Sequence, residues 1–297
     1  FLTGRTEDLG FVTMITNPGV NVTYLAVTVI VAFGILCFNL QGGLERITKY
    51  MMTLLMVLMV VLAVHSATLS GAAEGLKFYL VPDFSKITGT VIVGAMNQAF
   101  FTLSVGMGSM AIFGSYIGKE QSLLGESANV IVLDTFVAIV AGLIMFPACY
   151  TYGLEVNAGP SLLFVTLPTI LQDIPLGRLF AIILYVAMIF AGVSSLQNMF
   201  EAVAESLMHK FPRLSRTAVL VILCVVCLGF GIGMETIDKW GPWMDLVSIY
   251  IIPIGATLGA ISWFYVMKKD ELLDAVNTGS GKLRGNLWYS VGRYVYV

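Results

Sequence analysis

Long uncharged apolar stretches alternate with short polar ones along most of this chain. Because the apolar core of a bilayer is roughly 30 Å thick, a helix needs about 20 apolar residues to cross it. Stretches of this kind predict seven spans, with an eighth beginning near Leu287. A further apolar stretch at 156–172 contains Pro160 and Pro168, so we expect a re-entrant outer loop there. The approximate bounds of the seven spans are 22–38, 50–69, 87–118, 127–154, 179–208, 217–234 and 244–267.

The amino-acid composition is that of an integral membrane protein. Apolar residues make up 58% of the chain and charged residues 11%, against about 25% charged residues in an ordinary soluble domain. A soluble globule, a disordered chain and a coiled coil are therefore excluded. The net charge of −2 gives no indication of nucleic-acid binding. We expect an all-α, multi-pass protein of the cell membrane, in contact with the lipid bilayer.

A single transmembrane domain accounts for residues 1–297, since no linker or low-complexity stretch divides them. The chain begins at Phe1 and ends inside an apolar stretch, so we expect an internal piece of a longer protein. Lysine and arginine are enriched on the cytoplasmic side of membrane proteins, and ten of the 16 fall in loops that share one side. This bias places the N-terminal residue outside the cell. The ten are Arg46, Lys49, Lys119, Lys210, Arg213, Arg216, Lys268, Lys269, Lys282 and Arg284.

The stretch 87–118 is too long for one plain helix, and it contains Gly106 and Gly108. Each glycine lowers helix stability by about 1 kcal/mol relative to alanine. Two of them close together favour an unwound centre, which is tolerated at membrane depth only where it lines a cavity or a buried site. Such a centre presents carbonyl groups to cations and N–H groups to carboxylates. Close packing of helices through small residues is the alternative, and the excess length favours the broken helix.

Few polar side chains interrupt the other predicted spans. Asp134 is the single formal charge within its span, which makes it a functional candidate, with a structural ion pair as the alternative. Ser194 and Ser195 can offer oxygen atoms to a hard cation such as sodium, unless both bond to carbonyls of their own helix. Cys224 and Cys227 have metal-like spacing, but they lie in an apolar run without a second pair, so we reject a zinc site.

Four stretches together resemble the neurotransmitter:sodium symporters, sodium-coupled transporters with the LeuT-type inverted-repeat fold. His65–Leu80 is similar to the end of that family's fifth helix and the loop after it, and Gln98–Tyr116 is similar to its broken sixth helix. Phe164–Pro168 resembles the re-entrant outer loop, and Ala191–Ser195 resembles the sodium-binding stretch of helix eight. Order and spacing agree over nearly the whole chain. The resemblance implies a bacterial-like member, represented from about helix four to the start of helix eleven.

The resemblance also implies roles for individual residues. It implies two sodium sites and no organic cofactor, with helices one and three of the family completing the site. The arginine partner of Asp245 would lie in helix one. The matching positions are Thr102 and Asp134 for sodium site 1; Ala191 (by its carbonyl), Ser194 and Ser195 for sodium site 2; Phe101, Thr102, Ser104, Met107 and Met199 for the substrate; and Phe101, Gln98 and Asp245 for the gates.

Two positions depart from the chloride-dependent members of that family. Those members usually carry asparagine where this chain has Asp134, and a chloride-contacting serine where it has Ala138. A fixed carboxylate in place of a mobile anion implies chloride independence.

These observations predict a secondary transporter and not an enzyme. The protein would couple the sodium gradient to uptake of a neutral amino acid or related amine by alternating access. Phe101, Met107 and Met199 favour large aliphatic or aromatic substrate side chains, since a charged one would be left unpaired. The alternative is a non-transporting membrane scaffold or a channel-like subunit. The sequence sets no oligomeric state.

Overall fold

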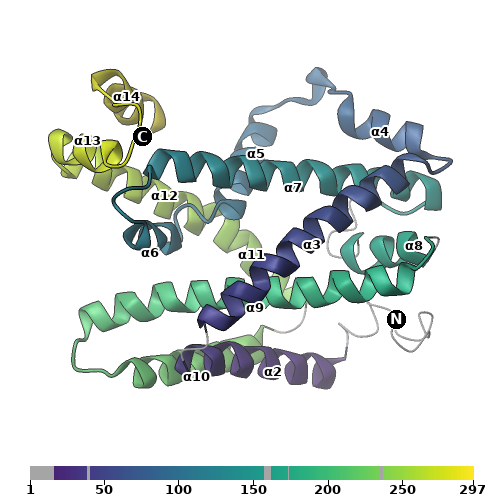
Figure 1. The fold of residues 1–297 in the computed structure, drawn as a ribbon, viewed down its shortest axis with the longest axis horizontal. Helices are drawn as coiled ribbons and strands as arrows, with labels where there is room; N and C mark the ends of the chain where they lie inside the picture. Colours follow the sequence, from purple (N-terminus) through teal and green to yellow (C-terminus); the bar gives the residue numbers. More distant parts are fainter. Residues whose placement is uncertain (1–16, 39–40, 157–161, 173, 235–236) are drawn as a thin grey trace. The chain divides into compact units, whose positions relative to one another are not determined.

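The computed structural model describes residues 17–38, 41–156, 162–172, 174–234 and 237–297. Within these ranges every regular element is helical (Figure 1), which agrees with the predicted all-α class. The helices belong to two compact units. The first unit contains the described residues up to Asp83 together with Val137–Trp240, and the second contains Phe84–Phe136 together with Gly241–Val297.

The first unit is arranged around α9 (Gly177–Lys210), a helix of 34 residues. The helices α2, α3, α8 and α10 all pack against α9, and α2 and α10 also pack against each other. The other elements of this unit are α2 (Pro18–Cys37), α3 (Gln41–Ala67), α4 (Ala72–Leu80), the π-helical turn η2 (Leu162–Thr166), α8 (Leu167–Gln172) and α10 (Arg216–Gly233).

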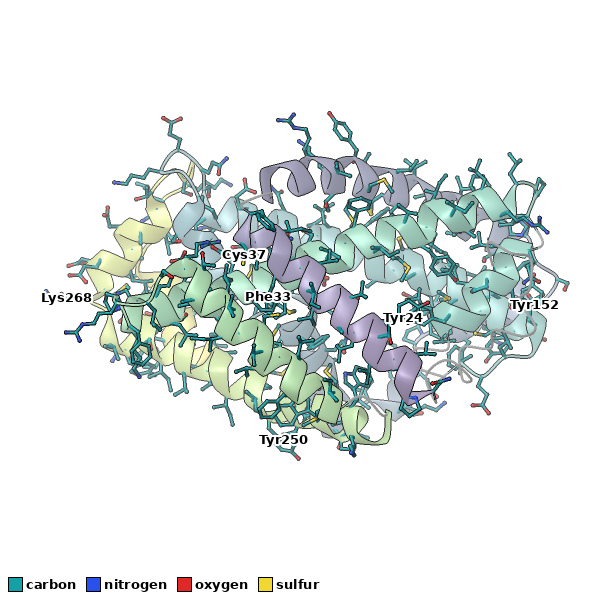
Figure 2. The ribbon with its side chains drawn as sticks, turned by 90° about the horizontal axis from the view of Figure 1, so that it is seen from below. Tyr24, Phe33, Cys37, Tyr152, Tyr250 and Lys268 are labelled. Carbon is teal, nitrogen blue, oxygen red and sulfur yellow. The ribbon has the colours of Figure 1, made fainter. Side chains whose placement is uncertain are left out.

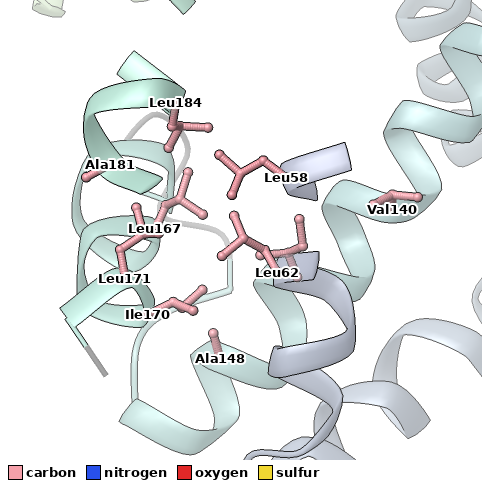
Figure 3. Close-up of a cluster of buried hydrophobic side chains, with 10 residues drawn as sticks. Leu58, Leu62, Val140, Ala148, Leu167, Ile170, Leu171, Ala181 and Leu184 are labelled. Carbon is pink, nitrogen blue, oxygen red and sulfur yellow. The ribbon is translucent and has the colours of Figure 1, made fainter. Parts of the chain in front are cut away.

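Two apolar clusters hold the first unit together. In the larger one, Leu58 and Leu62 of α3 point toward leucines of α8 and α9, among them Leu167 (Figure 3). In the other, the ring of Phe33 on α2 stacks on Phe200 of α9 with 4.2 Å between the ring centroids. Because lipid tails are as apolar as leucine, close packing and not the exclusion of water stabilises such contacts in a membrane.

The second unit contains the two helices that replace the longest predicted span. α5 (Gly89–Thr102) packs against α12 (Ile252–Ile261) and the π-helical turn η3 (Val247–Ile251). The helix α7 (Leu123–Tyr152) contributes its residues up to Phe136 to this unit and the remainder to the first. Further elements are η1 (Phe84–Lys86), α6 (Ser109–Tyr116), η4 (Ser262–Val266), α13 (Lys269–Asn277), α14 (Asn286–Val291) and η5 (Gly292–Tyr296). The helix α11 (Ile237–Leu246) is divided between the units after Trp240.

Several helices begin where the sequence supplies a capping side chain. The side chain of Asn17 accepts a hydrogen bond from the backbone of α2 at 3.3 Å, and Pro18 follows as the first helical residue. Thr88 caps α5 in the same way, and Ser215 caps α10. A short polar side chain satisfies backbone donors that have no partner in the first turn, and proline has no donor to lose there.

Six helices within the described residues are long and apolar enough to cross a membrane, and each overlaps one of the predicted spans. Large side chains project from their surfaces; Tyr24 is 62% exposed and Tyr250 is 60% exposed (Figure 2). The remaining predicted span, 87–118, is divided between α5 and α6. The re-entry of 156–172 into the membrane stays a prediction, and 157–161 lies outside the described residues.

Candidate functional site

The expected break in the longest apolar stretch is present. α5 ends at Thr102 and α6 begins at Ser109, and the six residues between them, here called the joint (103–108), are not helical (Figure 1). Three residues of the joint have positive φ: Ser104 at 55°, Gly106 at 88° and Gly108 at 78°. Glycine adopts this region without the strain that a Cβ atom introduces. The two glycines therefore permit the chain to leave the helix.

The joint leaves backbone groups without helical partners. The Ser104 N–H donates to the carbonyl of Phe101 at 3.1 Å, and the Val105 N–H donates to that of Phe100 at 2.9 Å. The N–H groups of Gly106, Met107 and Gly108 donate no hydrogen bond to any described residue. An unpaired backbone group inside a membrane costs several kcal/mol of free energy. This cost is similar to that of burying any polar group without a hydrogen bond. Such groups are therefore available to a polar ligand.

A hydroxyl and a carboxylate meet directly before the joint. Thr102, the last residue of α5, donates from Oγ1 to Oδ2 of Asp134 on α7 at 3.1 Å. The same hydroxyl lies 3.4 Å from the carbonyl oxygen of Ala99. Asp134 is half-buried. A hydroxyl that donates its one proton keeps two lone pairs. The structure thus brings together the two side chains that were predicted for sodium site 1, and both offer oxygen to a cation.

The predicted substrate positions come from both units. Phe101, Ser104 and Met107 lie in or next to the joint and are half-buried. Met199 lies on α9 in the first unit and is 44% exposed. Its place beside the other three stays a prediction.

The predicted gate residues besides Phe101 lie on exposed surfaces. Gln98 is on α5, one turn before Thr102, and Asp245 is near the end of α11. Asp245 forms no ion pair with any residue in the described ranges. The gate roles of both stay predictions.

The residues predicted for sodium site 2 lie on one continuous helix. Ala191, Ser194 and Ser195 occupy the middle of α9. On the same helix, Ser206 donates to the carbonyl of Ala202 at 2.8 Å. In contrast, neither Ser194 nor Ser195 donates a hydrogen bond to a described residue. Within the described residues the structure thus shows no bond from either hydroxyl to a carbonyl of α9, and the sodium role of the three residues stays a prediction.

One feature of the site was not predicted from the sequence. The joint approaches α12 so closely that a Cβ atom on Gly106 would collide with the carbonyl of Ile252 and the nitrogen of Ala256. A Cβ atom on Gly255 would collide with the carbonyl of Gly106. The signal available in the sequence was Gly255 itself, a glycine within an apolar helix, but the sequence does not show which backbone it meets.

A charged contact near the end of α9 was also not predicted as a pair. Arg216, the first residue of α10, donates two hydrogen bonds to Glu201, at 2.6 and 2.7 Å. Glu205 lies 3.5 Å from the same guanidinium. A bidentate guanidinium–carboxylate pair is stronger and more directional than a single contact. It joins α9 to α10 near the turn between them.

Comparisons with known proteins agree with this architecture. The profile described as Sodium:neurotransmitter symporter family matches residues 4–295. The crystal structure of MhsT in complex with L-phenylalanine superposes with a TM-score of 0.87 at 32% identity, covering 95% of this chain and 67% of that one. The uncharacterized sodium-dependent transporter YhdH of Bacillus subtilis is 35% identical over 96% of this chain. An uncharacterized sodium-dependent transporter of Haemophilus influenzae is 35% identical over 71% of this chain.

The chain spans 66% and 46% of the length of these two curated relatives. The match to the family profile nevertheless extends over almost all of its residues. The break that Gly106 and Gly108 predicted lies between α5 and α6 of this chain. The chain belongs to the sodium:neurotransmitter symporter family and has its LeuT-type fold.

Proposed function

We propose that this chain forms part of a sodium-coupled symporter that takes up a neutral amino acid by alternating access. The observation that carries the proposal is the Thr102–Asp134 pair at 3.1 Å, placed directly before an unwound joint with free N–H groups. Cation ligands and carboxylate-binding donors thus lie within a few residues of each other. The names of the bacterial relatives as sodium-dependent transporters support the same conclusion.

Sodium at site 1 would be held by Asp134 and Thr102. Sodium is a hard cation, and it prefers hydroxyl, carboxylate and carbonyl oxygens. In a medium of low dielectric, the negative charge of Asp134 offsets the charge of the ion and lowers the cost of burying it. The carboxylate of an amino acid would accept hydrogen bonds from the N–H groups of the joint. Ion and substrate would therefore favour each other's binding.

Sodium at site 2 would be held by neutral oxygens on α9. The sodium ligands from this chain would be the Ala191 carbonyl oxygen and the hydroxyl oxygens of Ser194 and Ser195. The two hydroxyls make no hydrogen bond to described residues, so binding an ion there breaks no such bond. No carboxylate belongs to this set, so we expect site 2 to bind sodium more weakly than site 1.

Chloride independence follows from the fixed charge at Asp134. Ala138, one helical turn later on α7, has no hydroxyl to offer to an anion. Replacing chloride by gluconate is expected to leave uptake unchanged. The double variant Asp134→Asn with Ala138→Ser is expected to become chloride-sensitive. Strong chloride stimulation of the unmodified protein would contradict this part of the proposal.

The substrate is expected to be a neutral amino acid with a large apolar side chain. Phe101, Met107 and Met199 are the predicted contacts, and thioethers adapt well to aromatic rings. The solved relative MhsT carries L-phenylalanine, which supports this class over charged substrates and amines without a carboxylate.

We expect the N-terminal end of the chain outside the cell, because most of the basic residues fall in loops predicted to be cytoplasmic. Two exposed positions test this topology: Phe84, expected outside, and Leu214, expected inside. A membrane-impermeant maleimide added to intact cells should label Phe84→Cys above the background of native thiols and leave Leu214→Cys unlabelled. The reverse pattern would invert the topology.

The test of transport uses the complete protein in proteoliposomes with an inward sodium gradient. Radiolabelled phenylalanine and leucine should accumulate, and replacing sodium by potassium should abolish accumulation. Unlabelled tryptophan should compete, whereas lysine, glutamate and phenethylamine should not. Uptake that is equal in potassium would refute sodium coupling. Binding of an amino acid without accumulation would favour the scaffold alternative.

A further inference from the structure

Two backbones of the second unit approach each other closely where the joint crosses α12. Any side chain on Gly106 would collide with the α12 backbone at Ile252 and Ala256, and any side chain on Gly255 would collide with the carbonyl of Gly106. The contact is therefore reciprocal. Alanine has the smallest side chain with a Cβ atom, and it already exceeds the available space on either side.

The joint has two attachments of different kinds within this unit. Before it, the Thr102 hydroxyl donates to Asp134 of α7. In its second half, Gly106 rests against Gly255 of α12. The residues between these points include Ser104, which has a positive φ of 55° without being glycine. A segment without helical hydrogen bonds has little rigidity of its own, so its neighbours determine its conformation.

We infer that Gly255 is a positioning residue that holds the joint against α12. We call the contact between Gly106 and Gly255 the seat, and we infer that it sets the affinity of sodium site 1. The inference rests on the proposed function. The seat fixes the position of the joint along the axis of α12. It therefore also fixes where the carbonyl and N–H groups of the joint lie relative to Thr102 and Asp134. A displaced joint would keep its sequence and its polar groups but lose the geometry in which they act together.

Helix propensity alone does not explain Gly255. Alanine is preferred to glycine inside a helix, and the φ of Gly255 is not positive. The same helix has a second glycine one turn later, Gly259, whose added Cβ atom would meet nothing within 4 Å. Gly255 therefore differs from Gly259 in one respect, the backbone that faces it.

The chain supplies a matched set of four glycine-to-alanine variants. Gly255→Ala introduces the collision without a backbone conflict, and Gly259→Ala introduces neither. Gly108→Ala conflicts with a φ of 78° without a collision, and Gly106→Ala combines both. Comparing them separates the loss of the seat from strain in the joint and from a general effect of alanine.

The first measurement is hydrogen exchange of the joint in the complete protein, followed by mass spectrometry. Exchange in peptides covering 103–108 should be faster in Gly255→Ala than in the unmodified protein and unchanged in Gly259→Ala. This readout does not depend on transport. If Gly255→Ala and Gly259→Ala exchange alike, the seat does not hold the joint and the inference is wrong.

The second measurement is the sodium concentration for half-maximal phenylalanine binding. Overpacking at the seat should raise it by about tenfold to a hundredfold in Gly255→Ala, with Gly259→Ala unchanged and equal yields of folded protein for both. An equal sodium response in the two variants would overturn the inference. Absence of any sodium response in the unmodified protein would refute the proposed function instead, while the exchange measurement would still decide whether the seat exists.

Discussion

The joint and the middle of α9 offer oxygen atoms to ligands in two different ways. At the joint the helix itself is interrupted, so backbone groups become available beside the Thr102–Asp134 pair. In α9 the helix stays continuous, and the hydroxyls of Ser194 and Ser195 donate no hydrogen bond to described residues. The first arrangement contains a full negative charge, and the second contains neutral oxygens alone.

This difference predicts that the two regions bind an ion with different strength and release it with different ease. An interrupted helix costs several hydrogen bonds and needs glycines and a tight support, here α12. An intact helix with two free hydroxyls needs none of these. We therefore expect the joint to hold its ion as part of the substrate site, and α9 to hold an ion that leaves more readily. The predictions below test this contrast, beginning with the largest expected effect.

Removal of the charge at the joint should have the largest effect. In Asp134→Ala the cation at site 1 loses its counter-charge, and a charge left without its partner is costly in a medium of low dielectric. Sodium-dependent binding should therefore fall by more than about a hundredfold. The measurement is a sodium titration of phenylalanine binding to the complete protein. A titration curve like that of the unmodified protein would show that the ion does not sit at Asp134.

The hydroxyl of Thr102 should contribute less than the carboxylate. Thr102→Val keeps the shape of the side chain but removes one cation ligand and the donor to Asp134, whereas Thr102→Ser keeps both. A hydrogen bond to a charged group contributes about 1.5–3 kcal/mol, so the valine variant should need about tenfold or more sodium. The serine variant should resemble the unmodified protein. If Thr102→Ser needs as much sodium as Thr102→Val, the methyl group of Thr102 matters and its hydroxyl does not.

The neutral site on α9 should show a smaller effect again. Ser194→Ala with Ser195→Ala removes two oxygen ligands without leaving an unpaired charge, so sodium affinity should fall by about tenfold. Ser206→Ala is the control on the same helix, since its hydroxyl is already bonded to the carbonyl of Ala202. If the double variant has the same sodium affinity as this control, the assignment of site 2 to α9 is wrong. A loss equal to that of Asp134→Ala would contradict the contrast between the two regions.

The sequence predicted the parts of this molecule that depend on local composition. The uncharged lengths located the helices, and the 32-residue stretch with Gly106 and Gly108 predicted the break, because glycine acts on the backbone where it stands. The resemblance to a known family, and not residue chemistry alone, placed Thr102 beside Asp134. Contacts between distant segments were not predictable in this way. Gly255 and Gly106 are ordinary glycines until the chain brings their backbones together.

The pair of Glu201 and Arg216 illustrates the same limit with charged residues. Both are visible in the sequence, but their separation of 15 residues includes the turn between α9 and α10, and helix periodicity does not fix how the two helices meet. The structure shows a bidentate contact with Glu201 and a longer one of 3.5 Å from Arg216 to Glu205. This contact holds the intact helix at its end, as the glycine contact holds the joint.

The ion pair on α9 gives the smallest expected effect. Lysine at position 216 keeps the charge but cannot form the two parallel hydrogen bonds of a guanidinium, and the arginine side chain is 36% exposed. Exposed ion pairs contribute about 0–1 kcal/mol and charged hydrogen bonds somewhat more, so Arg216→Lys should lower the thermal midpoint of the purified protein by a few degrees. Lys268→Met is the control, because Lys268 is 84% exposed and lies 3.6 Å from Glu271, so its loss should not shift the midpoint. Equal midpoints for Arg216→Lys and Lys268→Met would mean that packing along α2, α3, α8 and α10 alone holds α9 in place. A clear drop confined to Arg216→Lys would show that a continuous helix, like the joint, depends on a specific contact with its neighbour.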